Sequence, residues 1–291
     1  MVSIPKLPAK TRDRLILSVL SSVFILIWWA IYPQIVRSLS GENYFVARFY
    51  DVGQGDAILL QYRSTQILVD GGPDERILSH LGEDLLPWDQ EIELLVLTHP
   101  QADHLTGLLG VLERYKVKNV LYYPSLYDTK GYQQFLDLIA KEGALIFLAQ
   151  RGQQLEVGPL LLQVVWPPAN YHAKNVNNES VILVAEYGEF SLFLPGDLEE
   201  DGQKKLSINH DVDLIKMAHH GAQSGLYPPL LQAIAPDLAV ISVGKGNRFG
   251  HPHEQTLAAL RQLGVPYLRT DLNGTITIGS NGKDFWYDTD R

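Results

Sequence analysis

Cysteine is absent from the chain of 291 residues, and methionine occurs only twice. The lack of cysteine excludes disulfides and thiolate metal ligands, so any metal site must use histidine, carboxylate and amide side chains. Basic residues are also scarce, with 24 Lys and Arg against 33 Asp and Glu and a formal charge of -9. This balance argues against broad electrostatic capture of nucleic acid, which depends on cationic side chains. A nucleic acid would have to be held locally, by metal and a few basic residues.

The scarce basic residues are concentrated near the amino terminus. The first 37 residues hold five of them and one acidic residue, so the rest of the chain is more acidic than the whole. No shift in composition after residue 40 indicates a second domain. We expect four segments along the chain: a cytoplasmic basic segment at residues 1–14, a transmembrane helix at 15–36, a linker at 37–43 and one domain at 44–291.

The predicted membrane helix is a long uncharged run. Residues 15–32 carry no charge, and extension to residue 36 gives a length close to the roughly 20 residues that a membrane helix requires. Because basic residues precede the run, the positive-inside rule places the amino terminus in the cytoplasm and the large domain at the outer face of the cell membrane. The alternatives are a cleaved signal peptide, which usually has a shorter apolar run, and a buried core helix, which usually has a polar stripe.

Histidine and aspartate gather directly after a short apolar run. Residues 94–97 are typical of a buried strand, and His99, Asp103 and His104 follow it ahead of a predicted helix at residues 108–115. Side chains in such a turn can point at one position from a rigid base. Two imidazoles and a carboxylate suit zinc, manganese or iron. The alternative is a set of capped or surface side chains, but buried charge at this density needs a cation or a partner.

Two later strand ends repeat this design. Asp197 follows a predicted strand at residues 190–194, and His219 and His220 end another at residues 213–218, each beside a glycine. Taken alone, Asp197 is also typical of a helix N-cap. Adjacent imidazoles at a strand end are costly to bury without a metal or hydrogen-bond partners. The recurrence favours a metal centre.

The arrangement of predicted strands indicates the fold class. Aromatic and β-branched residues predict a meander of three strands, with Asp56 in the glycine-rich turn before the second and Asp70 at the end of the third. Asp70 would orient a ligand histidine or cap the turn. Helices and strands then alternate, and a second strand-rich half follows. Two such halves predict two sheets packed face to face with helices outside.

Several motifs together carry a resemblance to a known family. The run from His99 to His104 resembles the His-x-His-x-Asp-His signature of the metallo-β-lactamase superfamily, and Asp70-Gly-Gly, Asp197 and the two adjacent histidines stand in the order that superfamily uses. A narrower resemblance, to the carboxy-terminal domain of the ComEC competence proteins over residues 44 to 287, rests on four further motifs: Asp51-Val-Gly-Gln-Gly-Asp56, Leu194-Pro-Gly-Asp197, Asn247-Arg-Phe-Gly-His251-Pro and Thr270-Asp-Leu-Asn-Gly274.

This resemblance implies an α+β fold, a four-layer αββα sandwich with one or two divalent ions (manganese, zinc or magnesium) at the edge between the sheets. It also implies a hydrolase that cleaves phosphodiester bonds of DNA during DNA uptake, with the membrane and channel subunits as further partners. ComEC proteins carry a many-helix channel region before this domain. Because one membrane helix is predicted here, the chain resembles a stand-alone version.

One departure from the superfamily signature concerns the metal ligands. Gln101 stands where the superfamily has its second histidine, and Asn178 matches the position of a third ligand. The resemblance thus implies two sets of ligands around a shared Asp197: His99, Gln101 and Asn178 on one side, and Asp103, His104 and one of His219 and His220 on the other. Amide and carboxylate oxygens favour a harder ion, so manganese or magnesium would compete with zinc, and single occupancy is open.

Other residues are assigned roles in hydrolysis. Asp103 can act as ligand and proton acceptor, and His251 can donate to phosphate or to the leaving group, unless it belongs to a stiff exposed loop. The basic residues nearest the motifs would contact phosphate, although solvated charges are the alternative for each: Lys216, Lys245 and Arg248. Two alternatives to a nuclease are a metallo-hydrolase of a small substrate and a non-catalytic module that binds DNA or assembles with channel subunits.

Overall fold

The computed structural model describes residues 18–23, 28, 44–208 and 211–291. The chain divides into two compact units, residues Met1–Glu42 and Asn43–Arg291. Most of the predicted membrane helix at residues 15–36 lies outside the described residues. Within the described part of the chain, no helix has the length and apolar character needed to cross a membrane. All further description concerns the second unit.

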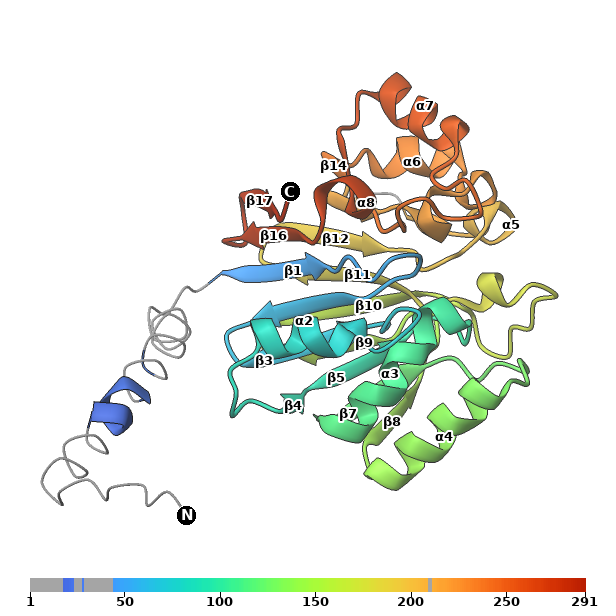
Figure 1. Ribbon diagram of the computed structural model, residues 1–291. Coiled ribbons are helices and arrows are strands. Elements are labelled where there is room, and N and C mark those ends of the chain that lie inside the picture. The colour runs from blue at the N-terminus through green and yellow to red at the C-terminus, as the bar shows by residue number, and fades with distance from the viewer. Residues whose placement is uncertain (1–17, 24–27, 29–43, 209–210) are drawn as a thin grey trace, which may run out of the picture. The chain divides into compact units, whose positions relative to one another are not determined.

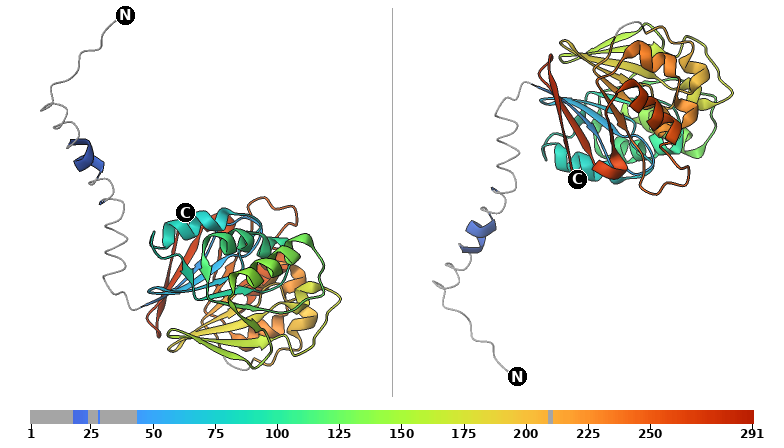
Figure 2. Two further views of the ribbon diagram at one scale, coloured as in Figure 1. Left: turned by 90° about the horizontal axis from the view of Figure 1, so that it is seen from below. Right: turned by 90° about the horizontal axis from the view of Figure 1, so that it is seen from above.

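A mixed sheet of eight strands forms the first half of the unit. The first three strands are antiparallel, as the predicted meander requires, and the sheet then continues with parallel neighbours. The two carboxy-terminal strands, red in Figure 2, return to lie beside the first strand, in blue. Its order is β17-β16-β1-β2-β3-β5-β7-β8, with β1 Phe45–Phe49, β2 Ile58–Tyr62, β3 Thr65–Val69, β5 Leu94–Leu97, β7 Asn119–Tyr122, β8 Leu145–Leu148, β16 Ile276–Ser280 and β17 Phe285–Thr289.

The second half is a sheet of seven strands. Its order is β15-β14-β13-β12-β11-β10-β9, with β9 Gln154–Val157, β10 Leu160–Trp166, β11 Ile182–Tyr187, β12 Phe190–Leu194, β13 Leu214–Lys216, β14 Leu238–Ile241 and β15 Tyr267–Arg269. Strand β10 alternates buried and half-buried residues, and β14 is buried throughout. This contrast fits an antiparallel strand with one open face and a parallel strand covered on both faces. Strands β4 Glu91–Ile92 and β6 Lys116–Val117 form a small parallel sheet of their own.

Helices cover the outer face of each sheet (Figure 1). The first sheet carries α2 Arg76–Asp84, α3 Ala102–Arg114 and α4 Lys130–Glu142, and the second half carries α5 Glu200–Gln203, α6 Pro228–Ile234, α7 Glu254–Leu263 and α8 Thr270–Asn273. Three short 3-10 turns complete the elements, η1 Val176–Glu179, η2 Ala218–Gly221 and η3 Gln223–Gly225.

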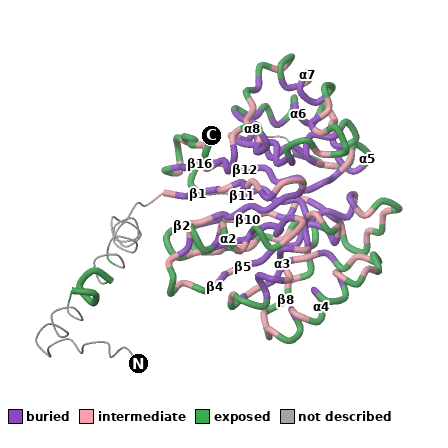
Figure 3. Tube along the Cα trace, viewed as in Figure 1, coloured by how far each residue is buried: buried purple, intermediate pink, exposed green. Residues whose placement is uncertain are grey.

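Three apolar layers hold these elements together, as the band of buried strands in Figure 3 illustrates. One fills the space between the sheets and includes Phe49 and Leu192, a second joins the first sheet to its helices and includes Phe135, and a third joins the second sheet to α6 and α7 and includes Leu231. Three cores between four layers define the αββα sandwich that the sequence predicted.

The parallel strands determine where polar side chains can meet. Strands β3, β5 and β7 run parallel, and so do β12, β13 and β14. Carboxyl ends of parallel strands lie at one edge of a sheet, where ligand sites of open α/β sheets form. The motifs that contain His99, Asp197 and His220 follow β5, β12 and β13, so the fold brings predicted ligands from both sheets to one edge.

Candidate metal centre

The turn after β5 differs in one respect from the sequence prediction. Helix α3 begins at Ala102 rather than at residue 108, so Asp103 and His104 lie in its first turn. The amide of Leu105 donates to the Gln101 carbonyl at 3.0 Å and closes that turn. The backbone of a helix therefore fixes both side chains more rigidly than a loop would.

His104 is fully buried, and its orientation is set by Asp70 at the end of β3. Its Nδ1 lies 2.7 Å from Asp70 Oδ2, while the amide and hydroxyl of Thr98 also donate to Asp70, at 2.8 and 2.6 Å. A carboxylate partner keeps a proton on Nδ1, so Nε2 is the nitrogen that would bind a cation in exchange for its proton. Burial alone would lower the pKa of His104, but the carboxylates of Asp197 and Asp70 outweigh it and raise that pKa well above its usual value.

His220 approaches from the second sheet. It follows β13 and is buried, and its Nδ1 donates to the carbonyl of Ser242 at 3.0 Å, so Nε2, which is directed at Asp103 and Asp197, is the nitrogen that a cation would bind. The backbone of His219 and His220 is left-handed, with φ of 50° and 54°. Such strain in residues other than glycine clusters at functional sites.

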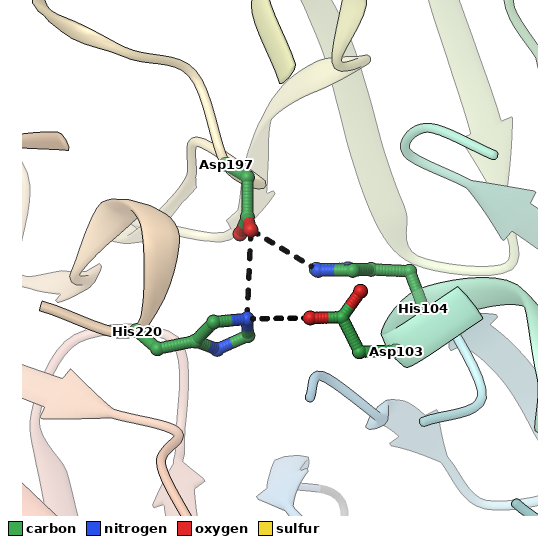
Figure 4. Close-up of side chains that lie close together, drawn as sticks. All are labelled: Asp103, His104, Asp197 and His220. Carbon is green, nitrogen blue, oxygen red and sulfur yellow. Dashed lines mark ion pairs between the residues drawn. The ribbon is translucent and has the colours of Figure 1, made fainter. Parts of the chain in front are cut away.

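Four side chains from three strand ends converge on one position (Figure 4). Asp197 Oδ2 lies 3.3 Å from His104 Nε2 and 3.5 Å from His220 Nε2, and the latter atom lies 3.4 Å from Asp103 Oδ2. One ligand atom of each residue lies within 4.8 Å of the others. This set of two imidazoles and two carboxylates matches the donors that zinc and manganese accept.

The ligand atoms of this cluster are also chemically unsatisfied. Asp197 Oδ2, His104 Nε2 and His220 Nε2 are buried and have no hydrogen-bond partner among the residues described. Buried polar atoms without partners are rare because each costs free energy, so three that face one point require an explanation. A divalent cation at that point satisfies all three. The residues present therefore fit the metal that the superfamily signature implies.

Lys216 has a different place from the substrate contact that the sequence suggested. It is fully buried, its ammonium forms an ion pair with Asp56, and it lies 3.0 Å from the Gly196 carbonyl and 3.5 Å from Asp197 Oδ1. No surface of this side chain is left for phosphate. Asp56 Oδ1 in turn lies 3.4 Å from His220 Nδ1, so the ion pair of Lys216 and Asp56 contacts the imidazole of the cluster on the side away from Nε2.

The other predicted ligands assemble less completely. His99 is buried with Nε2 3.3 Å from Gln101 Oε1, and its Nδ1 lies 3.1 Å from Thr98 Oγ1. Asn178 is directed elsewhere, because its Oδ1 accepts a hydrogen bond from the Glu199 amide at 3.1 Å. Burial and the neighbouring His104 lower the pKa of His99 to about 3, so this imidazole is neutral.

His219 and His251 flank the cluster. His219 Nε2 lies 3.8 Å from Asp197 Oδ2, while its Nδ1 faces Ser224 and Glu199 at 3.2 and 3.5 Å. The ring of His251 lies 5.6 Å from that of His219. Burial and the surrounding histidines lower the pKa of His251 to about 4, which keeps it neutral at physiological pH.

Lys245 and Arg248 lie on the exposed loop between β14 and α7, at the edge where β14 ends. Sequence reasoning missed three side chains that orient the cluster or its neighbours: Thr98 beside Asp70, Ser242 beside His220, and Gln54, whose Nε2 lies 3.4 Å from His251 Nδ1. Thr98 directly precedes His99, a predicted ligand, so its place next to the site could have been inferred from the sequence. The other two meet their partners only through the tertiary fold.

Fold and site together define a metallo-hydrolase of the αββα class. The family model for the metallo-β-lactamase superfamily matches residues 50–245, and the chain belongs to this superfamily.

Within the superfamily the chain is related to competence proteins. It is 31% identical to ComE operon protein 3 of Bacillus subtilis over 247 residues and 28% identical to competence protein ComA of Neisseria gonorrhoeae over 243 residues. These matches cover 78% and 82% of this chain but 32% and 33% of the relatives, so the chain spans about a third of their length. The structure of YhfI, a metallo-β-lactamase fold protein from Bacillus subtilis, superposes with a TM-score of 0.54 at 12% identity, covering 84% of this chain and all of YhfI. That likeness concerns the fold alone.

Proposed function

We propose that the domain is a metal-dependent nuclease that cleaves the phosphodiester bonds of DNA. The observation that carries this proposal is the set of three buried ligand atoms without partners, aimed at one point from Asp197, His104 and His220. The relatives, a ComE operon protein and a competence protein, support DNA as the substrate.

The cluster residues contribute in two ways. A bound divalent ion supplies Lewis-acid polarisation of a phosphoryl oxygen and makes water a stronger nucleophile near neutral pH. Asp103, His104, Asp197 and His220 hold this ion. Asp103 has a side chain that is 31% exposed, so it faces solvent as well as the cluster. Although burial opposes ionisation, the neighbouring His220 and the charge of His104 hold the pKa of Asp103 well below its usual value, so it is a carboxylate suited to bind a cation and only a weak proton acceptor.

His251 is prepared to donate one hydrogen bond. The amide of Gly244 donates to Gln54 Oε1 at 3.1 Å, which turns Gln54 Nε2 toward His251 Nδ1. Nδ1 therefore accepts, and the neutral ring carries its proton on Nε2. That N–H is available for a phosphoryl oxygen. At its low pKa, His251 stabilises charge by hydrogen bonding rather than by full proton transfer.

The setting of the reaction is part of the proposal. We place the domain at the outer face of the cell membrane, anchored by residues 15–36 with the amino terminus in the cytoplasm, and acting in DNA uptake with channel subunits as partners. The basic residues ahead of the uncharged run and the relatedness to competence proteins support this placement. Manganese, zinc and magnesium are the candidate ions, because the cluster mixes imidazole and carboxylate ligands.

Cleavage of single- and double-stranded DNA by the full chain, with manganese, magnesium or zinc added separately, tests the nuclease. The Asp197→Ala protein should lose both bound metal and cleavage. Asp201→Ala, at an exposed position in α5, is the matched control and should retain both. Undiminished cleavage by Asp197→Ala would reject the site. Metal binding without cleavage of any DNA would favour a hydrolase of a small substrate, and neither binding nor cleavage would favour a non-catalytic module.

A further inference from the structure

The loop between β14 and α7 presents an aromatic side chain next to the metal centre. Phe249 is 50% exposed, an unusual exposure for a phenylalanine ring. The loop leaves the carboxyl end of β14, the same edge of the sheet from which His220 reaches the cluster. The ring is therefore open to solvent and belongs to a loop that starts near the charged cluster, where a ligand can reach it.

Asn247 holds this loop in one conformation. Its Nδ2 donates to the carbonyls of Gly244 and His251 at 3.0 and 2.7 Å, and its Oδ1 accepts from the amides of Phe249 and His251 at 3.1 and 3.0 Å. Further along the chain, the His253 amide donates to the Gly221 carbonyl at 3.0 Å, which ties the loop to the turn that carries His220. Hydrogen bonds therefore fix the conformation of the loop that carries Phe249.

A series of rings connects Phe249 to the cluster. The Phe249 and His251 rings lie 5.6 Å apart at an interplanar angle of 25°, and the His251 and His220 rings lie 6.4 Å apart at 27°. The guanidinium of Arg248 lies 4.9 Å from the centre of the Phe249 ring. The ring of His251 thus lies between Phe249, with its neighbour Arg248, and His220, a proposed metal ligand.

We propose that Phe249 and Arg248 form a stacking platform for an unpaired nucleobase of the DNA strand whose backbone enters the metal centre. This inference rests on the proposed function and specifies its substrate as single-stranded. Every base has a π face that can stack on an aromatic ring or an arginine plane, whereas a duplex hides those faces. The acidic composition supports the same mechanism, because a chain with net charge -9 has little cationic surface for binding phosphates. Stacking supplies affinity that charge does not.

Binding of fluorescent DNA to the full chain in chelator, where no cleavage occurs, tests the platform. The probes are a short thymidine homopolymer, the same backbone without bases, and a duplex of mixed sequence. Phe249→Ala should weaken binding of the homopolymer by about 5- to 150-fold, the range that stacking on one aromatic ring supports. Phe249→Trp should retain it. The wild-type protein should bind the abasic strand about as weakly as the Phe249→Ala protein binds the homopolymer. Phe249→Ala should leave the affinity for the abasic strand and for the duplex unchanged.

Trp88→Ala is the matched control, because Trp88 is also exposed (61%) and follows the carboxyl end of α2. It should bind all three probes like the wild type. Equal weakening of the homopolymer and the abasic strand in Phe249→Ala would mean a loss of loop structure and would overturn the platform, as would unchanged binding of the homopolymer. If the wild-type protein cleaves DNA while Phe249→Ala binds normally, the nuclease stands and the platform fails. If base-dependent binding is found without cleavage under any ion, the platform stands and the nuclease fails.

Discussion

The two halves of the centre use the same shared carboxylate but differ in completeness. On one side, His104 and His220 direct buried ligand atoms without hydrogen-bond partners at Asp197 Oδ2, and Asp103 lies within the same group. On the other side, His99 Nε2 has an amide oxygen beside it, that of Gln101 at 3.3 Å, in place of a charged ligand. The Asn178 oxygen that would complete this side accepts a backbone amide instead.

We call the side with Asp103, His104 and His220 the complete half and the side with His99 and Gln101 the incomplete half. The difference between them shows what a set of side chains needs in order to bind a cation. Every imidazole of the complete half has its Nδ1 bonded to a fixed acceptor, Asp70 for His104 and Ser242 for His220, so that Nε2 is the nitrogen directed at the cation site. The incomplete half offers neutral donors and shares its only charge with the other side. We therefore expect one tightly held ion in the complete half and weak or no binding in the other.

The largest effect is expected from removing the buried ammonium of Lys216, which forms an ion pair with Asp56 next to the complete half. Lys216→Met leaves the Asp56 carboxylate buried without its partner, and breaking such a pair costs about 3–5 kcal/mol of unfolding free energy. Denaturant unfolding of the metal-free protein measures this loss. Lys118→Met, which breaks surface pairs with Glu91 and Glu93, is the control and should cost at most about 1 kcal/mol.

A second substitution distinguishes the effect of the unpaired Asp56 carboxylate from the effect of the changed packing at Lys216. Adding Asp56→Asn to Lys216→Met removes the uncompensated carboxylate, so the double variant should be more stable than the single one. If Lys216→Met unfolds like the wild type, or if the double variant is no better, the ion pair does not support the cluster.

The next effect distinguishes the adjacent histidines. His220→Ala removes a ligand of the complete half and should weaken metal binding by more than about 100-fold, beyond the loss that follows removal of an orienting partner. His219→Ala removes a side chain whose Nε2 lies 3.8 Å from Asp197 Oδ2 and whose Nδ1 has other partners, so affinity should fall by less than about 10-fold. Competition with a chromogenic chelator measures both. Equal losses would mean that the two histidines share the ion.

Much of the fold could be predicted from the sequence because its signals are local. Apolar runs, glycine turns and the order of strands predicted two sheets with helices outside. The superfamily signature then specified the αββα sandwich. The first turn of α3 was missed because its helix signal at Asp103 and His104 is polar. These residues are helical because Leu105 bonds back to Gln101, a contact that periodicity does not reveal.

The site was predictable in its charged ligands and not in their supporting partners. His104 and Asp197 follow apolar strands, and both stand at positions that the superfamily uses, His104 within the signature and Asp197 after it. Lys216 has no such signal, since a lysine after a strand is usually exposed. Only the convergence of Asp56 and Asp197 around it explains why its ammonium is buried. One sequence does not report contacts between residues this far apart.

A smaller effect concerns pH. Burial alone would lower the pKa of His220, but Asp197 and Asp56 outweigh it and raise the pKa to about 9. A raised pKa stabilises the metal-free fold below the unfolded value near 6.5, and this contribution is lost as pH rises through about 9. The Tm of the chelated protein should therefore fall between these pH values, by on the order of 10 °C for a domain of this size. The metal-loaded protein should lack this decline because the ion takes the place of the proton. A parallel decline in both forms would contradict the assignment of His220.

The smallest effect should come from the incomplete half. Gln101→Ala should change the affinity for the first ion by no more than about threefold, because an amide that is not a ligand costs less than an orienting partner does. Gln101→His restores an imidazole beside the neutral His99 and should raise the metal content measured by mass spectrometry from one ion per chain toward two. A wild-type protein that already holds two ions, or a Gln101→Ala protein that holds none, would show that the two halves act as one centre. In that case the amide oxygen of Gln101 is itself a ligand, and the separation between a complete and an incomplete half fails.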